Sequence, residues 1–144
     1  MPPVNDFNVG SDTTISIINS GQIMRSSILT SFEARQITAS LKSTAIDGVN
    51  RYDEIEQGWE GTLDFDRADS ILDDFFAAKE VARYAGNTLP TISITETTTN
   101  VDGTVVKYRY PRCALKFDTI GARKGDSKVE ERVSWRSGRR IKVQ

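Results

Sequence analysis

The sequence contains no histidine and only one cysteine, and these absences exclude several kinds of site. A catalytic triad has no imidazole to use, and a zinc site built on cysteine pairs lacks its second thiol. No Walker loop and no dinucleotide-binding fingerprint occurs in the chain. A mechanism that uses carboxylates alone stays open, since acidic residues are plentiful and their spacing in space is not given by the sequence. We expect a protein that is not an enzyme and holds no metal or cofactor.

Long hydrophobic runs are also absent. No apolar stretch approaches the roughly 20 residues that span a bilayer, and residues 1–10 lack the basic region and apolar core of a secretory signal. We therefore expect a soluble protein that is made in a cytoplasm and does not insert into membranes. The length of 144 residues suits a single domain, residues 1–144. The lone Cys113 alternates with Leu115 and Phe117, which predicts a core or interface residue and not a reactive thiol.

A large net charge is missing too, because 19 Lys and Arg balance 20 Asp and Glu. This balance excludes a generally basic protein that coats nucleic acid. The charges are nevertheless unevenly distributed. Between Asp47 and Glu80, eleven carboxylates face three basic residues, whereas from Ile120 onward eight basic residues face three acidic ones. Such asymmetry suits head-to-tail contact between copies, although two solvated patches on a monomer would give the same composition.

The hydrophobic pattern has mostly the period of two that is typical of strands. Residues 19–21 predict a hairpin turn, and Asp102 with Gly103 predicts a second one. Residues 31–43 and 59–65 alternate clearly, whereas residues 45–58 are polar and irregular, so we expect a loop there. Residues 121–126 resemble a polar turn more than a phosphate loop. The phase of the following strand predicts either a bulge near Glu131 or a strand that is buried differently along its length.

One segment, residues 67–85, has helical spacing instead. Asp66 or Asp69 is placed to cap its start, and Arg83 with Gly86 suits its end. The predicted fold class is therefore mainly β: an antiparallel barrel or sandwich of seven or eight strands with one flanking helix.

Four sequence features occur in an order that resembles a known family. They are Gly58–Arg67 (GWEGTLDFDR), an acidic helix that ends in Tyr84–Gly86 (YAG), the segments ISIT and DGT, and Lys124–Trp135 (KGDSKVEERVSW). Together they resemble the tail tube proteins of bacteriophages, particularly those with contractile tails, over residues 32–143. Similar folds serve the inner tubes of contractile bacteriocins and type VI secretion machines.

The resemblance implies a β-barrel or sandwich with a helix on its flank. It implies six copies that form a ring, and rings that stack into a hollow tail tube of the virion. Sheath, baseplate and tail terminator proteins would be partners, and double-stranded DNA would pass through without specific binding. Residues 45–58 would reach the adjacent ring, with residues 1–12 as a flexible N-terminal arm and 137–144 as a C-terminal arm. For DNA passage, a lumen rich in Lys and Arg would be unfavourable because it would bind phosphates.

We expect the charged middle and the basic end to supply contacts between subunits, and the end to add as a strand to a neighbour. The candidate interface residues are Asp47, Arg51, Asp53, Glu54, Glu56, Trp59, Arg123, Lys124, Lys128, Arg136, Arg139, Arg140 and Lys142. Two alternatives remain. One is a tail terminator that forms a single ring, and the other is a monomeric carbohydrate-binding sandwich with Trp59 and Trp135 exposed.

Overall fold

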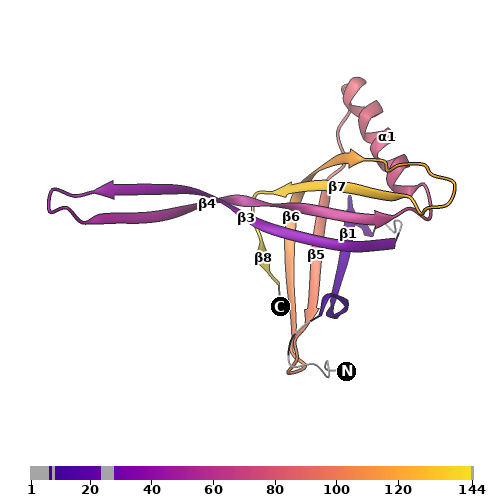
Figure 1. Ribbon diagram of the computed structural model, residues 1–144. Coiled ribbons are helices and arrows are strands. Elements are labelled where there is room, and N and C mark those ends of the chain that lie inside the picture. The colour runs from indigo at the N-terminus through magenta and orange to yellow at the C-terminus, as the bar shows by residue number, and fades with distance from the viewer. Residues whose placement is uncertain (1–6, 8, 24–27, 144) are drawn as a thin grey trace.

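The computed structural model describes residues 7, 9–23 and 28–143. Most of the expected N-terminal arm therefore lies outside the described residues, as do residues 24–27, which follow the hairpin turn predicted at residues 19–21. Gly10–Asp12 form a short 3-10 helix where the predicted arm ends. The rest consists of antiparallel strands, one helix and a long two-stranded ribbon that projects from the body (Figure 1).

The fold is mainly β, as predicted. The strands are β1 (Thr13–Asn19), β2 (Gln22–Ile23), β3 (Ile28–Thr44), β4 (Asn50–Asp66), β5 (Ile92–Thr99), β6 (Val105–Thr119), β7 (Glu130–Ser137) and β8 (Ile141–Lys142), and the helix is α1 (Ile71–Tyr84). The strands run in the order β2-β1-β5-β6-β7-β4-β3, and β8 pairs with β6 beside this path. Among the described strands the two ends of this order do not pair, so the fold is sandwich-like and not a closed barrel.

Strand β6 belongs to both sheets. Its first part pairs with β5, and its second part, from Ala114 onward, pairs with β7. Pro111 and Arg112 lie just before this change of partner, at the register shift between Tyr110 and Cys113 in the pairing with β5, and Arg112 has a φ of 50°. Proline lacks an N–H and a positive φ reverses the local pleat, so both features fit a bend in the strand. The bend turns one strand from the first sheet into the second and lets the two sheets enclose a core.

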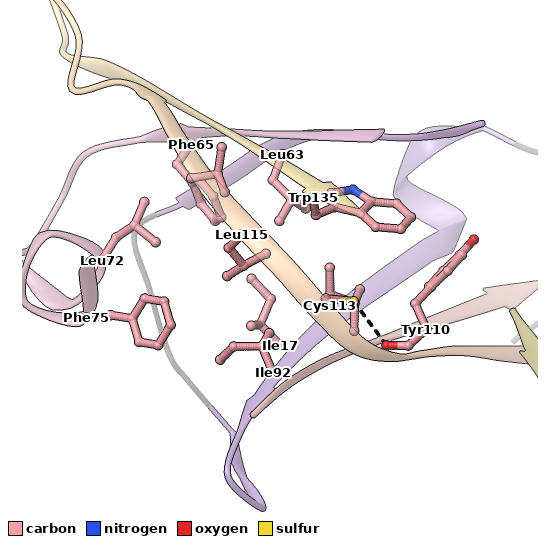
Figure 2. Close-up of a cluster of buried hydrophobic side chains, with 12 residues drawn as sticks. Ile17, Leu63, Phe65, Leu72, Phe75, Ile92, Tyr110, Cys113, Leu115 and Trp135 are labelled. Atoms are coloured by element: carbon pink, nitrogen blue, oxygen red, sulfur yellow. Dashed lines mark hydrogen bonds between the residues drawn. The ribbon is translucent and has the colours of Figure 1, made fainter. Parts of the chain in front are cut away.

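The core lies between the two sheets and under α1 (Figure 2). Its buried apolar members are Ile17, Leu63, Phe65, Leu72, Phe75, Ile92, Ile94, Tyr110, Cys113, Leu115, Val133 and Trp135. The indole of Trp135 stacks on Phe32 at 5.7 Å and meets Tyr110 edge-on at 4.7 Å between ring centroids. Cys113 donates its S–H to the carbonyl of Tyr110, and burial raises the pKa of the thiol to about 11. The prediction that Cys113 is a core residue is confirmed.

Helix α1 is shorter than the predicted span of residues 67–85. Asp69 accepts a hydrogen bond from the backbone N–H of Ile71 at 3.2 Å, while Gly86, with a φ of 74°, follows the last turn. The expected end signal at Gly86 is confirmed, whereas the N-cap position is Ser70 and not Asp66 or Asp69. Lys79 reaches across to donate to the carbonyl oxygen of Leu115 at 2.8 Å, and this contact ties the helix to β6.

The expected loop at residues 45–58 is wrong for most of its length. Strands β3 and β4 pair from Thr44 opposite Asn50 to Ile28 opposite Asp66, with register shifts between Leu29 and Ser31 and between Ile37 and Thr38, and only residues 45–49 form the connecting turn. The ribbon at the outer end of this pair, residues 38–56, has most of its side chains exposed on both faces. Without a buried face there is no alternation to recognise, so its strand character depends on pairing with a distant segment.

The bulge expected near Glu131 is also absent from β7. This strand alternates regularly between exposed and buried positions, and Glu131 simply occupies an inward one. The register shift lies on the opposite strand, between Phe117 and Thr119 of β6.

Candidate assembly surfaces

The acidic middle and the basic end of the chain meet within one molecule. Pairing of β4 with β7 places Asp64 opposite Arg132 and Glu60 opposite Arg136. The Nε atoms of these arginines lie 2.8 Å from Asp64 Oδ1 and 3.4 Å from Glu60 Oε2, respectively. Such cross-strand pairs stabilise the register of neighbouring strands. Arg136 therefore has a partner inside the chain, and its expected contact across subunits stays a prediction.

Lys128 also finds its partners inside the chain. Its Nζ atom lies 3.4 Å from Asp66 Oδ2 and 3.4 Å from Glu130 Oε1. The Asp66 carboxylate is the main cause of a raised pKa of Lys128. The expected intersubunit role of this exposed lysine also stays a prediction.

The C-terminal segment adds a strand to its own chain, contrary to the expectation of strand addition to a neighbour. Lys142 pairs with Tyr108 and Ile141 with Arg109, both on β6. Arg140 lies against the Tyr108 ring, 3.6 Å from its centroid, and its Nη2 is 3.2 Å from Glu96 Oε1.

The same guanidinium also faces the ring of Trp59, 4.9 Å away. Arg140 and the half-buried Trp59 thus fasten the C-terminus to the body. Arg139 and Lys142 are exposed.

The ribbon carries the predicted acidic candidates, and its two faces differ. On one face, Thr38 and Ser40 donate hydrogen bonds to the carboxylate of Glu54, at 2.9 and 2.7 Å. The Ser40 hydroxyl, then that of Thr38, lowers the pKa of Glu54. Glu56 pairs with Thr38 on this hydroxyl-rich face.

The other face is apolar near its base. There Ala39 pairs with Ile55, and Leu41 pairs with Asp53. Leu41 and Ile55 are both exposed. A two-stranded ribbon with an uncovered apolar face is marginally stable in water. It therefore has the character of a surface that is covered in an assembly.

The ribbon tip, residues 45–49, is the most exposed apolar feature of the described chain. Ile46 has a relative exposure of 108%, and Val49 is exposed beside it. Asp47 is 3.6 Å from Arg51 across the turn, so these two predicted candidates neutralise one another in part. Sequence reasoning missed Ile46 and Val49, although apolar residues that flank an Asp-Gly turn are an available signal, since such turns are normally polar.

A groove lies beside α1 at the other end of the molecule. Its volume is about 580 Å³, and Phe76, Phe117 and Ile120 contribute its apolar part. The rings of Phe76 and Phe117 stack with centroids 4.7 Å apart. We call this hollow the α1 groove.

The rim of the α1 groove carries Lys79, Arg83 and Arg123, together with the acids Asp73 and Glu80. Arg123 was a predicted candidate, as was Lys124 next to it. Within the described residues, Arg83, Arg123 and Lys124 lie in no salt bridge.

Beside this groove, Glu131 is a buried carboxyl group that the sequence did not single out as a site. Its relative exposure is 1%, and neither of its oxygens has a hydrogen-bond donor among the described residues. Burial, followed by the neighbouring carboxyl of Asp73, raises the pKa of Glu131 to about 7. Asp73 in turn is 3.0 Å from the Nε atom of Arg67. Asp73 Oδ1 is also buried without a hydrogen-bond partner among the described residues, and two neighbouring carboxyl groups with buried oxygens favour a neutral Glu131.

Neither a metal cluster nor a spanning helix is found in the described part of the chain. Three or more acidic, cysteine or histidine side chains nowhere converge there in a way that suits a metal ion. Likewise, α1 is not long and apolar enough to cross a membrane.

Comparison with solved structures gives consistent neighbours. No protein-family model and no curated protein matches the chain. A chain of the anti-feeding prophage tube terminating cap superimposes with a TM-score of 0.60 at 13% identity, covering 90% of this chain and 87% of that one. The fold is shared with tail components. A chain of an extracellular contractile injection system, the PVC sheath-tube complex, gives 0.58 at 13% identity with 89% and 86% coverage. One from the tail of an empty GTA particle gives 0.57 at 11% identity with 95% and 99% coverage.

Proposed function

We propose that this protein is a structural tail component that forms hexameric rings, and that the rings stack into the hollow inner tube of a contractile-type tail. The ribbon is the observation that carries the proposal. It projects from the body as a long hairpin with an exposed apolar tip. Such a hairpin is only marginally stable in an isolated monomer and is stabilised when another subunit covers it. The shared fold with chains of tube, cap and tail assemblies supports the same role.

The proposed place of action is the tail of a virion or related particle, assembled in the host cytoplasm. Sheath, baseplate and terminator proteins are the proposed partners, and double-stranded DNA is the proposed transient passenger. The charge pattern on the outer face of the β3-β4-β7 sheet supports the proposal that DNA passes without being bound. Its arginines are held by carboxylates, as in the Arg35–Glu60 pair at 3.7 Å and the Arg132–Asp64 pair at 2.8 Å. Paired arginines leave less free positive charge for phosphates.

A tail terminator that forms a single ring is the second candidate. The neighbours include, besides the prophage cap, a PVC sheath/tube terminator structure with a TM-score of 0.56 at 12% identity. The monomeric carbohydrate-binding alternative is weakened, because Trp135 has a relative exposure of 1% and Trp59 is half-buried under Arg140.

Negative-stain electron microscopy of the purified protein at several concentrations tests the proposal. Long hollow tubes or stacked rings are the expected result for a tube protein, whereas single rings that never stack would favour a terminator or a tube that needs a baseplate template. Monomers that also fail to polymerise on added baseplates would refute both tail roles. Titration with glycans would then examine the binding-module alternative.

A further inference from the structure

We propose that the ribbon tip of one copy seats in the α1 groove of a second copy. This contact deepens the proposed assembly function and rests on it, since it needs at least two copies. It names both partners of the interface, which are residues 45–49 on one side and the hollow between α1 and the end of β6 on the other.

The two surfaces match in hydrophobicity. Ile46 and Val49 are exposed apolar side chains at the end of a projecting hairpin. The α1 groove presents Phe76, Phe117 and Ile120 in a hollow of about 580 Å³, large enough for both side chains. Apolar side chains that enter a concave aromatic pocket are the usual anchors of protein interfaces. A covered tip would also remove the most exposed apolar residue of the described chain from water.

The two surfaces also match in charge. The ribbon, residues 38–56, carries four carboxylates and two basic residues. The rim of the α1 groove carries Lys79, Arg83 and Arg123, and of its two acids Asp73 is already held by Arg67 at 3.0 Å. An acidic ribbon approaching a basic rim is attracted and oriented before the apolar contact forms.

The positions of the two surfaces make the contact head-to-tail. In Figure 1 the ribbon tip lies at one extreme of the molecule and α1 at the opposite end. The tip of one molecule therefore cannot reach the α1 groove of the same molecule. The contact does not require a symmetric pair in which two molecules exchange tips. A contact between different surfaces of identical copies repeats until the assembly closes into a ring or continues as a filament.

Disulfide trapping tests the contact directly. We would combine Ile46→Cys at the tip with Ala77→Cys, which lines the groove on α1, and oxidise the protein at concentrations where particles form. Each copy then carries both halves of the contact, so the expected result is a ladder of covalent oligomers. The native Cys113 is buried and does not interfere. Both single variants, and the double variant Ile46→Cys with Lys116→Cys on the exposed face of the β6-β7 pair, should give no ladder.

A second measurement does not depend on cysteine geometry. Ile46→Asp places a charge in the apolar groove and should raise the protein concentration needed for assembly about tenfold or more. Gln57→Asp adds the same charge at an exposed position at the base of the ribbon, far from its tip, and should leave that concentration nearly unchanged.

The outcomes separate this inference from the proposed function. Particles that form normally but give no ladder, and that tolerate Ile46→Asp, would overturn the tip-to-groove contact while the tail role stands. If neither particles nor a ladder appear at any concentration or on added baseplates, both ideas fail. A ladder in the tip-to-groove double variant alone supports the inference, whether it stops at the ring number or continues beyond it.

Discussion

Replacing Glu131 with glutamine should make this protein more stable at neutral pH. In the folded chain the Glu131 carboxyl is buried without a hydrogen-bond donor, and burial and Asp73 raise its pKa from 4.5 to about 7. Arg67 and Arg123 oppose this change without cancelling it. The folded protein therefore retains a proton that the unfolded chain has lost. Glutamine has nearly the same shape, never ionises, and keeps an N–H to donate to Asp73.

The magnitude follows from the two pKa values. Below about pH 4.5 both folded and unfolded chains carry the proton, so ionisation has no effect on the free energy of unfolding. Between pH 4.5 and about 7 only the unfolded chain releases it, so that free energy falls as the pH rises. Above about 7 the loss is complete. At about 1.4 kcal/mol per pH unit, this difference corresponds to up to about 3 kcal/mol.

The assay is urea unfolding of wild type and Glu131→Gln at pH values from 4.5 to 8, at protein concentrations too low for assembly. The variant should match the wild type near pH 4.5 and exceed it by up to about 3 kcal/mol at pH 8. Glu130→Gln is the matched control, since its side chain is exposed and its variant should stay within about 0.5 kcal/mol at every pH. If Glu131→Gln is the less stable protein at pH 8, or if the gap does not change with pH, Glu131 is ionised and paired with an arginine, and the reasoning fails.

Three further predictions concern the fold. Arg140→Ala should lower the free energy of unfolding by about 2 kcal/mol, because a planar guanidinium both stacks on Tyr108 and binds Glu96. Arg140→Lys should recover little of this lost stability, and full recovery by lysine would contradict the role of the planar group. Gly61→Ala should lower the stability of the fold by about 3 kcal/mol or prevent folding, since the added Cβ would collide with the carbonyl oxygen of Glu33 on β3. A thermal melt followed by circular dichroism that equals the wild type would refute this close approach. Iodoacetamide at pH 8 should label Cys113 only after unfolding, because the thiol is buried and its pKa is about 11. Mass spectrometry measures the labelling, and rapid labelling of the native protein would contradict the buried position.

The local features of this fold could be predicted from the sequence because their chemistry is local. Asp102 and Gly103 do form the turn between β5 and β6, where Gly103 has a φ of 90°. Gly86, with a φ of 74°, does follow the end of α1, although the N-cap is Ser70 and not Asp69. In each case one or two residues determine the backbone without help from distant segments.

Features that depend on distant pairing could not be predicted in this way. The outer part of β4 is polar on both faces, and it becomes a strand because β3 lies beside it. The partners of Lys128 and Arg136 depend on the register between β4 and β7, which composition does not determine. The burial of Glu131 could not be predicted either. A carboxyl side chain is normally expected at the surface, but the alternation of β7 places Glu131 on the inward side of the strand. Part of the charge asymmetry is therefore used inside the chain, whereas the role of these residues in contacts between subunits stays a prediction.

If the proposed tail role and the proposed tip-to-groove contact both hold, the choice between tube and terminator can be tested by asking whether this contact joins copies within a ring or between rings. A contact within the ring would make Ile46→Asp prevent ring formation, leaving monomers in the electron microscope. A contact between rings would leave rings intact and abolish only their stacking, because the wall of each ring would be built from other strand edges. Wild-type tubes that become single rings in Ile46→Asp would therefore assign the ribbon to axial stacking and the protein to the tube. Wild-type protein that already stops at single rings, with an Ile46→Asp variant that forms none, would place the ribbon in the ring wall and favour the terminator.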